Sequence, residues 1–255
     1  MKSQYLSLVV AIVALLFGTM ANSVNAGEVN AAVAANFTKP MQEIVAQFEK
    51  KTGNTVKLSF GSSGKFYSQI KQGAPFDVFI SADVKNPKLL EDDGTAVKGS
   101  RFVYAQGKLV LWSKQSGFVD AKGAVLHDGK FNKLAYADAK LAPYGLAAKE
   151  TMEKMGLWDS LQGKLVTGES IAQTYQFAAS GNAELAFIAL SQITKDGKVM
   201  DGSYWLVPGD HYSPIEQSAE LLTAAKDKAA AQALLDYLKS DEARKVISSY
   251  GYGLP

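Results

Sequence analysis

The stretch that determines the fold is residues 29–80, VNAAVAANFTKPMQEIVAQFEKKTGNTVKLSFGSSGKFYSQIKQGAPFDVFI. Its short apolar or alternating runs at residues 29–35, 56–60 and 77–80 are typical of strands. Two amphipathic runs lie between these strands, and each of them ends at a glycine, as helices often do. This βαβαβ order predicts a parallel, doubly wound sheet, because each helix must return the chain to the same end of the sheet.

A second set of alternating elements follows further along the chain. Strands are expected at residues 109–112, 134–137, 165–166 and 183–190, and helices at residues 144–155 and in the run that carries Ile171 and Ala178. Residues 207–214 contain two prolines and a glycine and predict a linker. Residues 224–249 predict two helices that are broken near Ser240.

Composition excludes several classes of protein. The chain has 255 residues, 47% of them hydrophobic and 20% charged, which is typical of a globular protein of one large or two small domains. The net charge is only +2 and no block of like charge occurs, so we expect no nucleic-acid partner. The absence of cysteine from the sequence excludes disulfides, thiol catalysis and iron–sulfur clusters. The sequence has only two histidines, His127 and His211, and they lie far apart, so it offers few ligands for a metal site and few bases for a catalytic triad.

The N-terminus has the layout of a secretory signal. Lys2 supplies a positive charge, residues 6–17 are apolar, and small and polar residues follow as far as Ala26. We therefore expect a signal peptide over residues 1–26, with cleavage after Ala26. The apolar run is too short for a permanent membrane-spanning helix. Export together with the lack of cysteine suits the bacterial periplasm, where disulfides are permitted but not required.

One local pattern recurs along the chain: a strand, a small polar turn and the start of a helix. It occurs at Asn36, at Ser62-Ser63, at Tyr144-Gly145 and at Ser170-Ile171. In open α/β sheets ligands bind beyond the carboxyl ends of the strands, where helix N-termini present free N–H groups and partial positive charge. Four such ends would form an anion site from uncharged donors. The alternative is that these residues only cap their helices.

Five segments carry a more specific signal. They are AANFTKPM at residues 34–41, FGSSG at 60–64, GAPFDVFISAD at 73–83, PYGLAAKE at 143–150 and GESI at 168–171. These segments resemble the ligand turns and the most recognisable stretch of the periplasmic molybdate-binding proteins of ABC transporters. The resemblance extends over nearly the whole chain after the signal segment. It implies an α/β fold of two doubly wound lobes with a ligand cleft between them, similar to the type 2 periplasmic binding proteins.

The resemblance also implies the division of the chain and the site. Lobe 1 would comprise residues 27–105 and 213–255, and lobe 2 residues 106–212. The ligand-binding residues would be Asn36, Ser63, Tyr144 and Ile171. Ser63 would donate from its hydroxyl and its backbone N–H, Tyr144 and Ile171 from the backbone alone, and the Asn36 amide and N–H would replace a serine that many members have. Molybdenum would be held only as molybdate, through its oxygens, with no direct metal ligand, no cofactor and no catalytic residue.

The sequence departs from the family pattern at one position. Many members have a tyrosine hydroxyl donor in the strand after the fourth turn, where this chain has Ala189. Some members combine an asparagine in the first turn with a tyrosine in the third, and this chain resembles that subgroup. The donor count is therefore open at this point, whereas the class of ligand is not.

The function implied is capture and delivery rather than catalysis. A monomeric solute-binding protein would close on molybdate, and on tungstate of nearly equal size, and deliver it to an ABC permease driven by a separate ATPase. Molybdate has no proton to donate at neutral pH, so donors suffice, whereas phosphate requires an acceptor. Two alternatives stay open: a binding protein for another oxyanion such as sulfate or phosphate, and a hydrolase that uses Ser63, which would need a base beside that hydroxyl.

Overall fold

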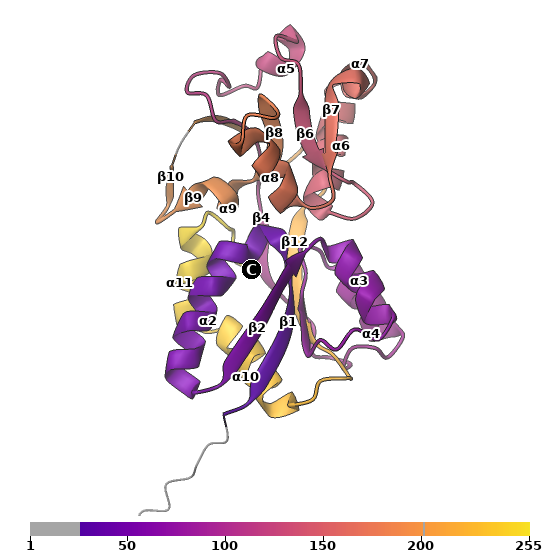
Figure 1. Ribbon diagram of the computed structural model, residues 1–255, viewed down its shortest axis with the longest axis vertical. Coiled ribbons are helices and arrows are strands. Elements are labelled where there is room, and N and C mark those ends of the chain that lie inside the picture. The colour runs from indigo at the N-terminus through magenta and orange to yellow at the C-terminus, as the bar shows by residue number, and fades with distance from the viewer. Residues whose placement is uncertain (1–25, 201) are drawn as a thin grey trace, which may run out of the picture.

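The computed structural model describes residues 26–200 and 202–255. The expected signal peptide, residues 1–26, lies outside these ranges except for Ala26. The described chain forms two lobes that lie one above the other along the longest axis of the molecule (Figure 1). Within the described ranges, none of the helices combines the length and the apolar character that a membrane span requires.

Lobe 1 is built on a five-stranded sheet in the order β2-β1-β3-β12-β4. Its strands are β1 (Glu28–Ala34), β2 (Thr55–Gly61), β3 (Val78–Ile80), β4 (Phe102–Gly107) and β12 (Ile215–Leu221). Its helices are the 3₁₀ helix η1 (Ala35–Phe37), α2 (Thr38–Thr52), α3 (Ser63–Lys71), α4 (Lys85–Asp92), α10 (Lys228–Leu238) and α11 (Asp241–Ser249). This lobe therefore combines the first and the last parts of the described chain.

Lobe 2 is built on a second five-stranded sheet in the order β11-β5-β8-β6-β7. Its strands are β5 (Leu109–Ser113), β6 (Leu134–Ala137), β7 (Leu165–Gly168), β8 (Leu185–Ala189) and β11 (Ser203–Leu206), and a small hairpin adds β9 (Thr194–Lys195) and β10 (Lys198–Val199). Its helices are α5 (Val125–Asp128), α6 (Pro143–Lys154), α7 (Trp158–Leu161), the 3₁₀ helix η2 (Gln162–Lys164), α8 (Ile171–Ala179) and α9 (Leu190–Ile193).

The direction of the strands is only partly as predicted. β1 runs parallel to β2 and β3, which confirms the βαβαβ prediction for the start of the chain. A purely parallel sheet is wrong, because β12 is antiparallel to β3 and β4, and in lobe 2 β5 is antiparallel to β8. β12 and β5 are the strands by which the chain enters each lobe from the other. They start at the edge where the parallel strands end, so they must run the opposite way.

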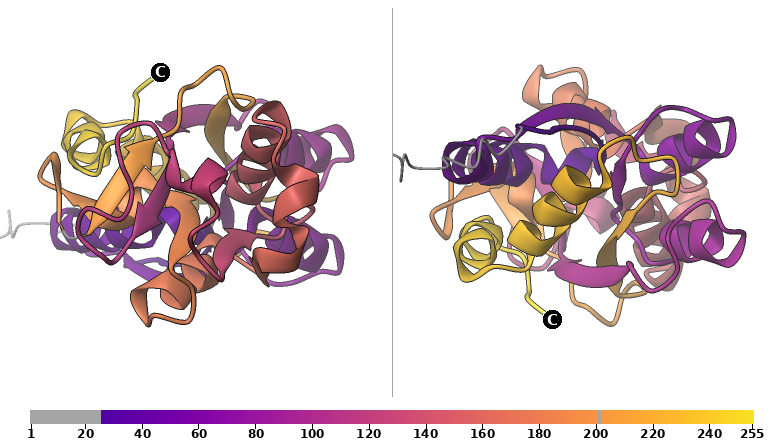
Figure 2. Two further views of the ribbon diagram at one scale, coloured as in Figure 1. Left: turned by 90° about the horizontal axis from the view of Figure 1, so that it is seen from above. Right: turned by 90° about the horizontal axis from the view of Figure 1, so that it is seen from below.

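Helix α2 shows how the sequence pattern determines packing. Its apolar residues Met41, Ile44, Val45 and Phe48 recur at helical spacing, and all are buried in the core of lobe 1. Gly53 ends the helix with a φ of 76°, a left-handed conformation that costs glycine little. The C-terminal helices α10 and α11, yellow in Figures 1 and 2, complete the same core.

The chain passes between the lobes twice. It crosses at Lys108, between β4 and β5, and again through residues 207–214, between β11 and β12. The division expected after Ala105 falls within β4, and the division expected before Ser213 falls within the second connection.

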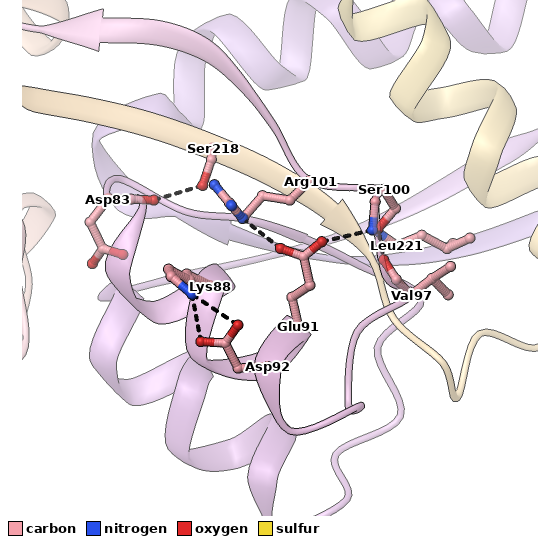
Figure 3. A network of polar contacts seen from close by, with 10 residues as sticks. Asp83, Lys88, Glu91, Asp92, Val97, Ser100, Arg101, Ser218 and Leu221 are labelled. Carbon is pink, nitrogen blue, oxygen red and sulfur yellow. Dashed lines mark hydrogen bonds and ion pairs between the residues drawn. The ribbon is translucent and has the colours of Figure 1, made fainter.

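β12, the strand that follows the second connection, is joined by hydrogen bonds to the segment that carries α4 (Figure 3). Ser218 Oγ donates to the Asp83 carbonyl oxygen at 3.0 Å. Beside it, Arg101 Nε donates to Glu91 Oε2 of α4 at 3.0 Å. Lobe 1 therefore holds the returning strand by side chains as well as by its sheet.

Candidate anion site

The four residues predicted to bind the ligand lie together. Asn36, Ser63, Tyr144 and Ile171 all line one cavity between the lobes. Its other lining residues are small or carry no charge: Ala34, Ala35, Gly61, Ser62, Ala82, Ala142 and Pro143. The cavity volume is about 10 Å³, far below the roughly 300–1,000 Å³ of pockets for organic ligands. The space is therefore far too small for an organic solute.

Each of the four residues stands in the first turn of a helix. Asn36 lies in η1, which runs directly into α2; Ser63 begins α3; Tyr144 is second in α6; and Ile171 begins α8. N–H groups in a first helical turn have no acceptor within their own helix, and they lie at the positive end of its dipole. Because the four turns border one cavity, they supply it with uncharged donors.

Ser63 is arranged to donate twice. Its Oγ accepts a hydrogen bond from the Ala82 N–H at 2.9 Å, so the hydroxyl proton is left free for another partner. The residue is 1% exposed, and a donor in such a dry position is worth more than one in water. Ser63 therefore presents both an O–H and the N–H that begins α3.

Tyr144 and Ile171 present only their backbone. The Tyr144 hydroxyl accepts from Gln217 Nε2 at 3.0 Å, so the side chain is engaged by β12. The Ile171 side chain is buried in the apolar core of lobe 2. The turn before it is fixed by Ser170, whose Oγ accepts from the Gln173 N–H and caps α8.

The Asn36 side chain is used differently from the expectation. Its Nδ2 donates to Gln217 Oε1 and to Tyr252 Oη, both at 2.8 Å. In the structure both hydrogens of the amide are therefore taken by the protein, whereas the expectation has this amide donate to the anion in place of a serine. The reason is that β12 and the C-terminal segment bring two acceptors to it. The backbone N–H of Asn36 remains as its donor.

Ser62 is a site residue that the sequence pattern marked only as part of a turn. It lines the cavity, and its hydroxyl oxygen is buried with no hydrogen-bond partner among the described residues. Leaving a buried hydroxyl unpaired costs ~1–3 kcal/mol. A bound anion would supply the missing partner.

The side chains that line the cavity are uncharged among the described residues. Ser63 Oγ is bonded to a backbone N–H and not to a base. Asp83, on the loop after β3, is not a lining residue. Its carboxylate accepts from the Asn86 N–H at 2.8 Å and from Asn86 Nδ2 at 2.7 Å, and burial raises the pKa of this carboxyl. Nor do the described residues bring three or more His, Asp or Glu side chains together in a group that could hold a metal ion.

The two lobes touch around the cavity. The Gly64 N–H donates to the Leu141 carbonyl oxygen at 2.9 Å, where a Cβ on Gly64 would come within 3.1 Å of Leu141. Lys65 Nζ lies 3.5 Å from Glu169 Oε2 at the rim. On the other side Lys39 Nζ donates to the Gln192 carbonyl oxygen at 3.1 Å. The cavity is therefore enclosed by both lobes in this state.

Behind the cavity lies a buried polar network that sequence reasoning missed. Gln217, at 0% exposure, accepts from Tyr104 Oη at 3.0 Å in addition to its contacts with Asn36 and Tyr144. Tyr252, in the C-terminal segment, joins this network through its contact with Asn36. Strand β12 was not predicted, because four of its seven residues are polar and their pattern indicates neither a buried strand nor a helix.

Ala189 offers no side-chain donor, as the sequence implies. It ends β8, and its N–H donates to Gln192 Oε1 at 2.9 Å. Gln192 Nε2 in turn donates to the Ile171 carbonyl oxygen at 3.0 Å. The position thus supports the turn of Ile171 instead of contributing a hydroxyl.

Known proteins resemble this chain in both sequence and fold. The profile of the bacterial extracellular solute-binding protein family matches residues 29–253. The molybdate-binding protein ModA of Azotobacter vinelandii is 57% identical over 243 residues, 95% of this chain and 96% of that protein. ModA of Rhodobacter capsulatus is 56% identical over 228 residues, 89% of this chain and 88% of that protein. Among solved structures, the periplasmic molybdate-binding protein of Azotobacter vinelandii matches with a TM-score of 0.87 and 41% identity, covering 89% of this chain and 99% of that chain.

Proposed function

Since this chain belongs to the bacterial extracellular solute-binding proteins, and within them to the molybdate-binding proteins, we propose that it captures molybdate in the cleft between its lobes. It is a binding protein and not an enzyme, as its relatives are. The fold is α/β with two doubly wound lobes, similar to the type 2 periplasmic binding proteins. The observation that carries the proposal is that four helix N-terminal turns, two from each lobe, line one small cavity without charged side chains.

The proposed donors come from both lobes. Lobe 1 supplies the N–H of Asn36 and the N–H and hydroxyl of Ser63, and lobe 2 supplies the N–H groups of Tyr144 and Ile171. The unpartnered Ser62 hydroxyl adds a further O–H. Hydrogen bonds to a charged group contribute ~1.5–3 kcal/mol each, so a handful of uncharged donors is enough to hold a dianion.

Selectivity follows from the lack of a charged acceptor. Molybdate is a dianion without a proton near neutral pH, and every oxygen can accept. Hydrogen phosphate would bring an O–H for which the described lining residues offer no carboxylate, and a buried donor without a strong acceptor is costly. Sulfate has the same charge but shorter bonds, so it would leave the fixed donors too far away. Tungstate, nearly equal to molybdate in size, should bind as well.

Delivery is the second half of the proposal. The anion bridges donors of both lobes, so the closed state is favoured when it is bound. We expect lobe boundaries at residues 27–105 with 213–255 and at 106–212. The chain would be exported through residues 1–26, cleaved after Ala26, and act in the periplasm as a monomer. It would hand molybdate to an ABC permease driven by a separate ATPase.

Calorimetric titration against a panel of oxyanions tests the proposal. We expect tight binding of molybdate and tungstate, and weak or no binding of sulfate and phosphate. Tight binding of sulfate or phosphate with no heat from molybdate would favour the binding protein for another oxyanion. Ester hydrolysis that is lost in Ser63→Ala would instead support the hydrolase.

A further inference from the structure

One fully buried amide connects both lobes behind the cavity. Gln217 Oε1 accepts from Asn36 Nδ2 at 2.8 Å and from Tyr104 Oη at 3.0 Å, both in lobe 1. Its Nε2 donates to Tyr144 Oη of lobe 2 at 3.0 Å. The side chain is 0% exposed, so these contacts are made without competition from water. Gln217 therefore holds two of the four cavity turns, Asn36 and Tyr144, at once.

Tyr252 completes the arrangement from the C-terminal segment. Its Oη accepts from Asn36 Nδ2 at 2.8 Å and donates to the Asn36 carbonyl oxygen at 2.9 Å. The same carbonyl accepts from Ser191 Oγ of lobe 2 at 3.0 Å. The Tyr252 ring stands edge-on against Phe37, with centroids 5.5 Å apart. The hydroxyl is thereby fixed by packing as well as by hydrogen bonds.

The consequence concerns which atoms can face the anion. Asn36 brings its backbone carbonyl and its side-chain amide close to the cavity, and a backbone carbonyl turned inward would repel an oxyanion. Such a carbonyl would also accept the proton of hydrogen phosphate, which the site must reject. In the structure the backbone carbonyl accepts from Tyr252 and Ser191, and the amide nitrogen donates to Gln217 and Tyr252. The backbone N–H is the donor that stays free for the cavity.

We propose that Gln217 and Tyr252 are positioning residues of the anion site, which engage the backbone carbonyl and amide nitrogen of Asn36 and the hydroxyl of Tyr144 and so fix the two turns that face the cavity. The inference rests on the proposed function and adds to it the residues that set its selectivity. Neither residue lines the cavity, so both act through Asn36 and Tyr144 and not by contact with the anion.

The groups of this network are uncharged. The phenols of Tyr104 on β4 and Tyr144 on α6 and the Asn36 amide bond to Gln217, and the phenol of Tyr252 on the C-terminal segment bonds to Asn36. Burial raises the pKa of all three phenols, so none ionises near neutral pH. A carboxylate introduced at residue 217 would be the first charge in this network.

Gln217→Glu tests the inference with almost no change of shape. At pH 8 the carboxylate cannot donate to Tyr144, and we expect molybdate affinity to fall by about 10- to 100-fold. At pH 6 more of the buried carboxyl is protonated, so part of the affinity should return, whereas the wild type should change little. Gln106→Glu on the adjacent β4 places the same charge at an exposed position and should leave affinity unchanged.

Tyr252→Phe is the second variant and needs no new charge. It removes the hydroxyl bonded to Asn36, so we expect the preference for molybdate over phosphate to narrow by about 10-fold. Tyr250→Phe is its matched control, because the Tyr250 hydroxyl lies in the same segment but bonds to Glu43 Oε2 at 3.1 Å. Both measurements are calorimetric, and a melting curve without anion verifies that each variant is folded.

The outcomes separate this inference from the proposed function. A wild type that does not bind molybdate would overturn the proposed function itself. A wild type that binds molybdate, with folded Gln217→Glu and Tyr252→Phe that match it in affinity, pH profile and selectivity, would overturn only the positioning role. If Gln217→Glu does not fold, Tyr252→Phe against Tyr250→Phe decides alone.

Discussion

Ser63 is the residue at which the donor hypothesis can be tested most directly. Removal of its hydroxyl in Ser63→Ala should weaken molybdate binding by ~1–3 kcal/mol, because one donor to a charged group is lost in a dry site. Ser68→Ala is the control, since Ser68 lies on the same helix, is exposed and bonds to the Gly64 carbonyl oxygen. Calorimetry should separate the two variants. Equal affinity in both would show that the Ser63 hydroxyl does not contact the anion.

At Ile171 the backbone can be tested apart from the side chain. Ile171→Pro deletes the N–H at the first position of α8, where helices tolerate proline. Ser170 already has the extended backbone that precedes proline, with φ −148° and ψ 163°. We expect ~1–3 kcal/mol of lost affinity. Ile171→Val keeps the N–H and should bind molybdate nearly as tightly as the wild type does. If Ile171→Val instead lost more molybdate affinity than Ile171→Pro, the side chain and not the N–H would be the important group.

What the sequence reveals about single residues depends on how local their partners are. The position of Ser63, Tyr144 and Ile171 at helix starts that border one cavity could be predicted, because a turn before a helix is visible in a few consecutive residues. The partners of the Asn36 amide could not be predicted, because Gln217 and Tyr252 lie 181 and 216 positions away. Partners at that separation leave no periodic trace in one sequence.

At the scale of elements, β12 contains an unusual buried acid. Glu220 is 0% exposed, neither carboxyl oxygen has a hydrogen-bond partner among the described residues, and burial raises its pKa to about 9. The nearby Glu91 acts in the same direction, and Arg101 opposes it. At neutral pH the folded protein therefore keeps a proton on Glu220 that the unfolded chain releases.

This proton makes stability depend on pH. As the pH rises from about 4.5 towards 9, the unfolded chain loses the Glu220 proton first, so the free energy of unfolding should fall by at most about 1.4 kcal/mol per pH unit. Glu220→Gln has no proton to lose and should be more stable than the wild type at pH 8, with a flatter profile. Glu216→Gln, exposed on the same strand, should follow the wild type. Urea unfolding at pH 5 and pH 8 would measure both slopes, and parallel slopes for the wild type and Glu220→Gln would contradict the assignment.

The elements themselves were predictable to the extent that their patterns were regular. β6, at residues 134–137, and the break between α10 and α11 near Ser240 were found as expected. β12 was not found, because Glu216, Gln217, Ser218 and Glu220 make it look like a loop although most of it is buried. Its antiparallel course depends on the path of the chain between lobes, which no local pattern encodes.

At the scale of the whole molecule, the contact at Gly64 should control closure. A side chain at this position would press on Leu141, where even a Cβ comes within 3.1 Å. Gly64→Leu should therefore hold the lobes apart, keep the larger radius of gyration in X-ray scattering when molybdate is added, and bind at least about 10-fold more weakly. The wild type should contract.

Lys65→Leu is the control for this experiment. It adds the same side chain one residue further on and removes only the exposed ion pair to Glu169, which is worth at most about 1 kcal/mol. We expect it to contract on molybdate as the wild type does. Contraction of Gly64→Leu to the same degree would mean that the lobes close without this contact.

The lining of the cavity has a further consequence for unloading. None of the described lining side chains is charged, so a moderate change of pH cannot release the ion while the ion keeps its double charge. The ion can leave only when the halves are pulled apart and water reaches the exposed amides. Unloading must therefore depend on separation of the lobes and not on the titration of a lining side chain.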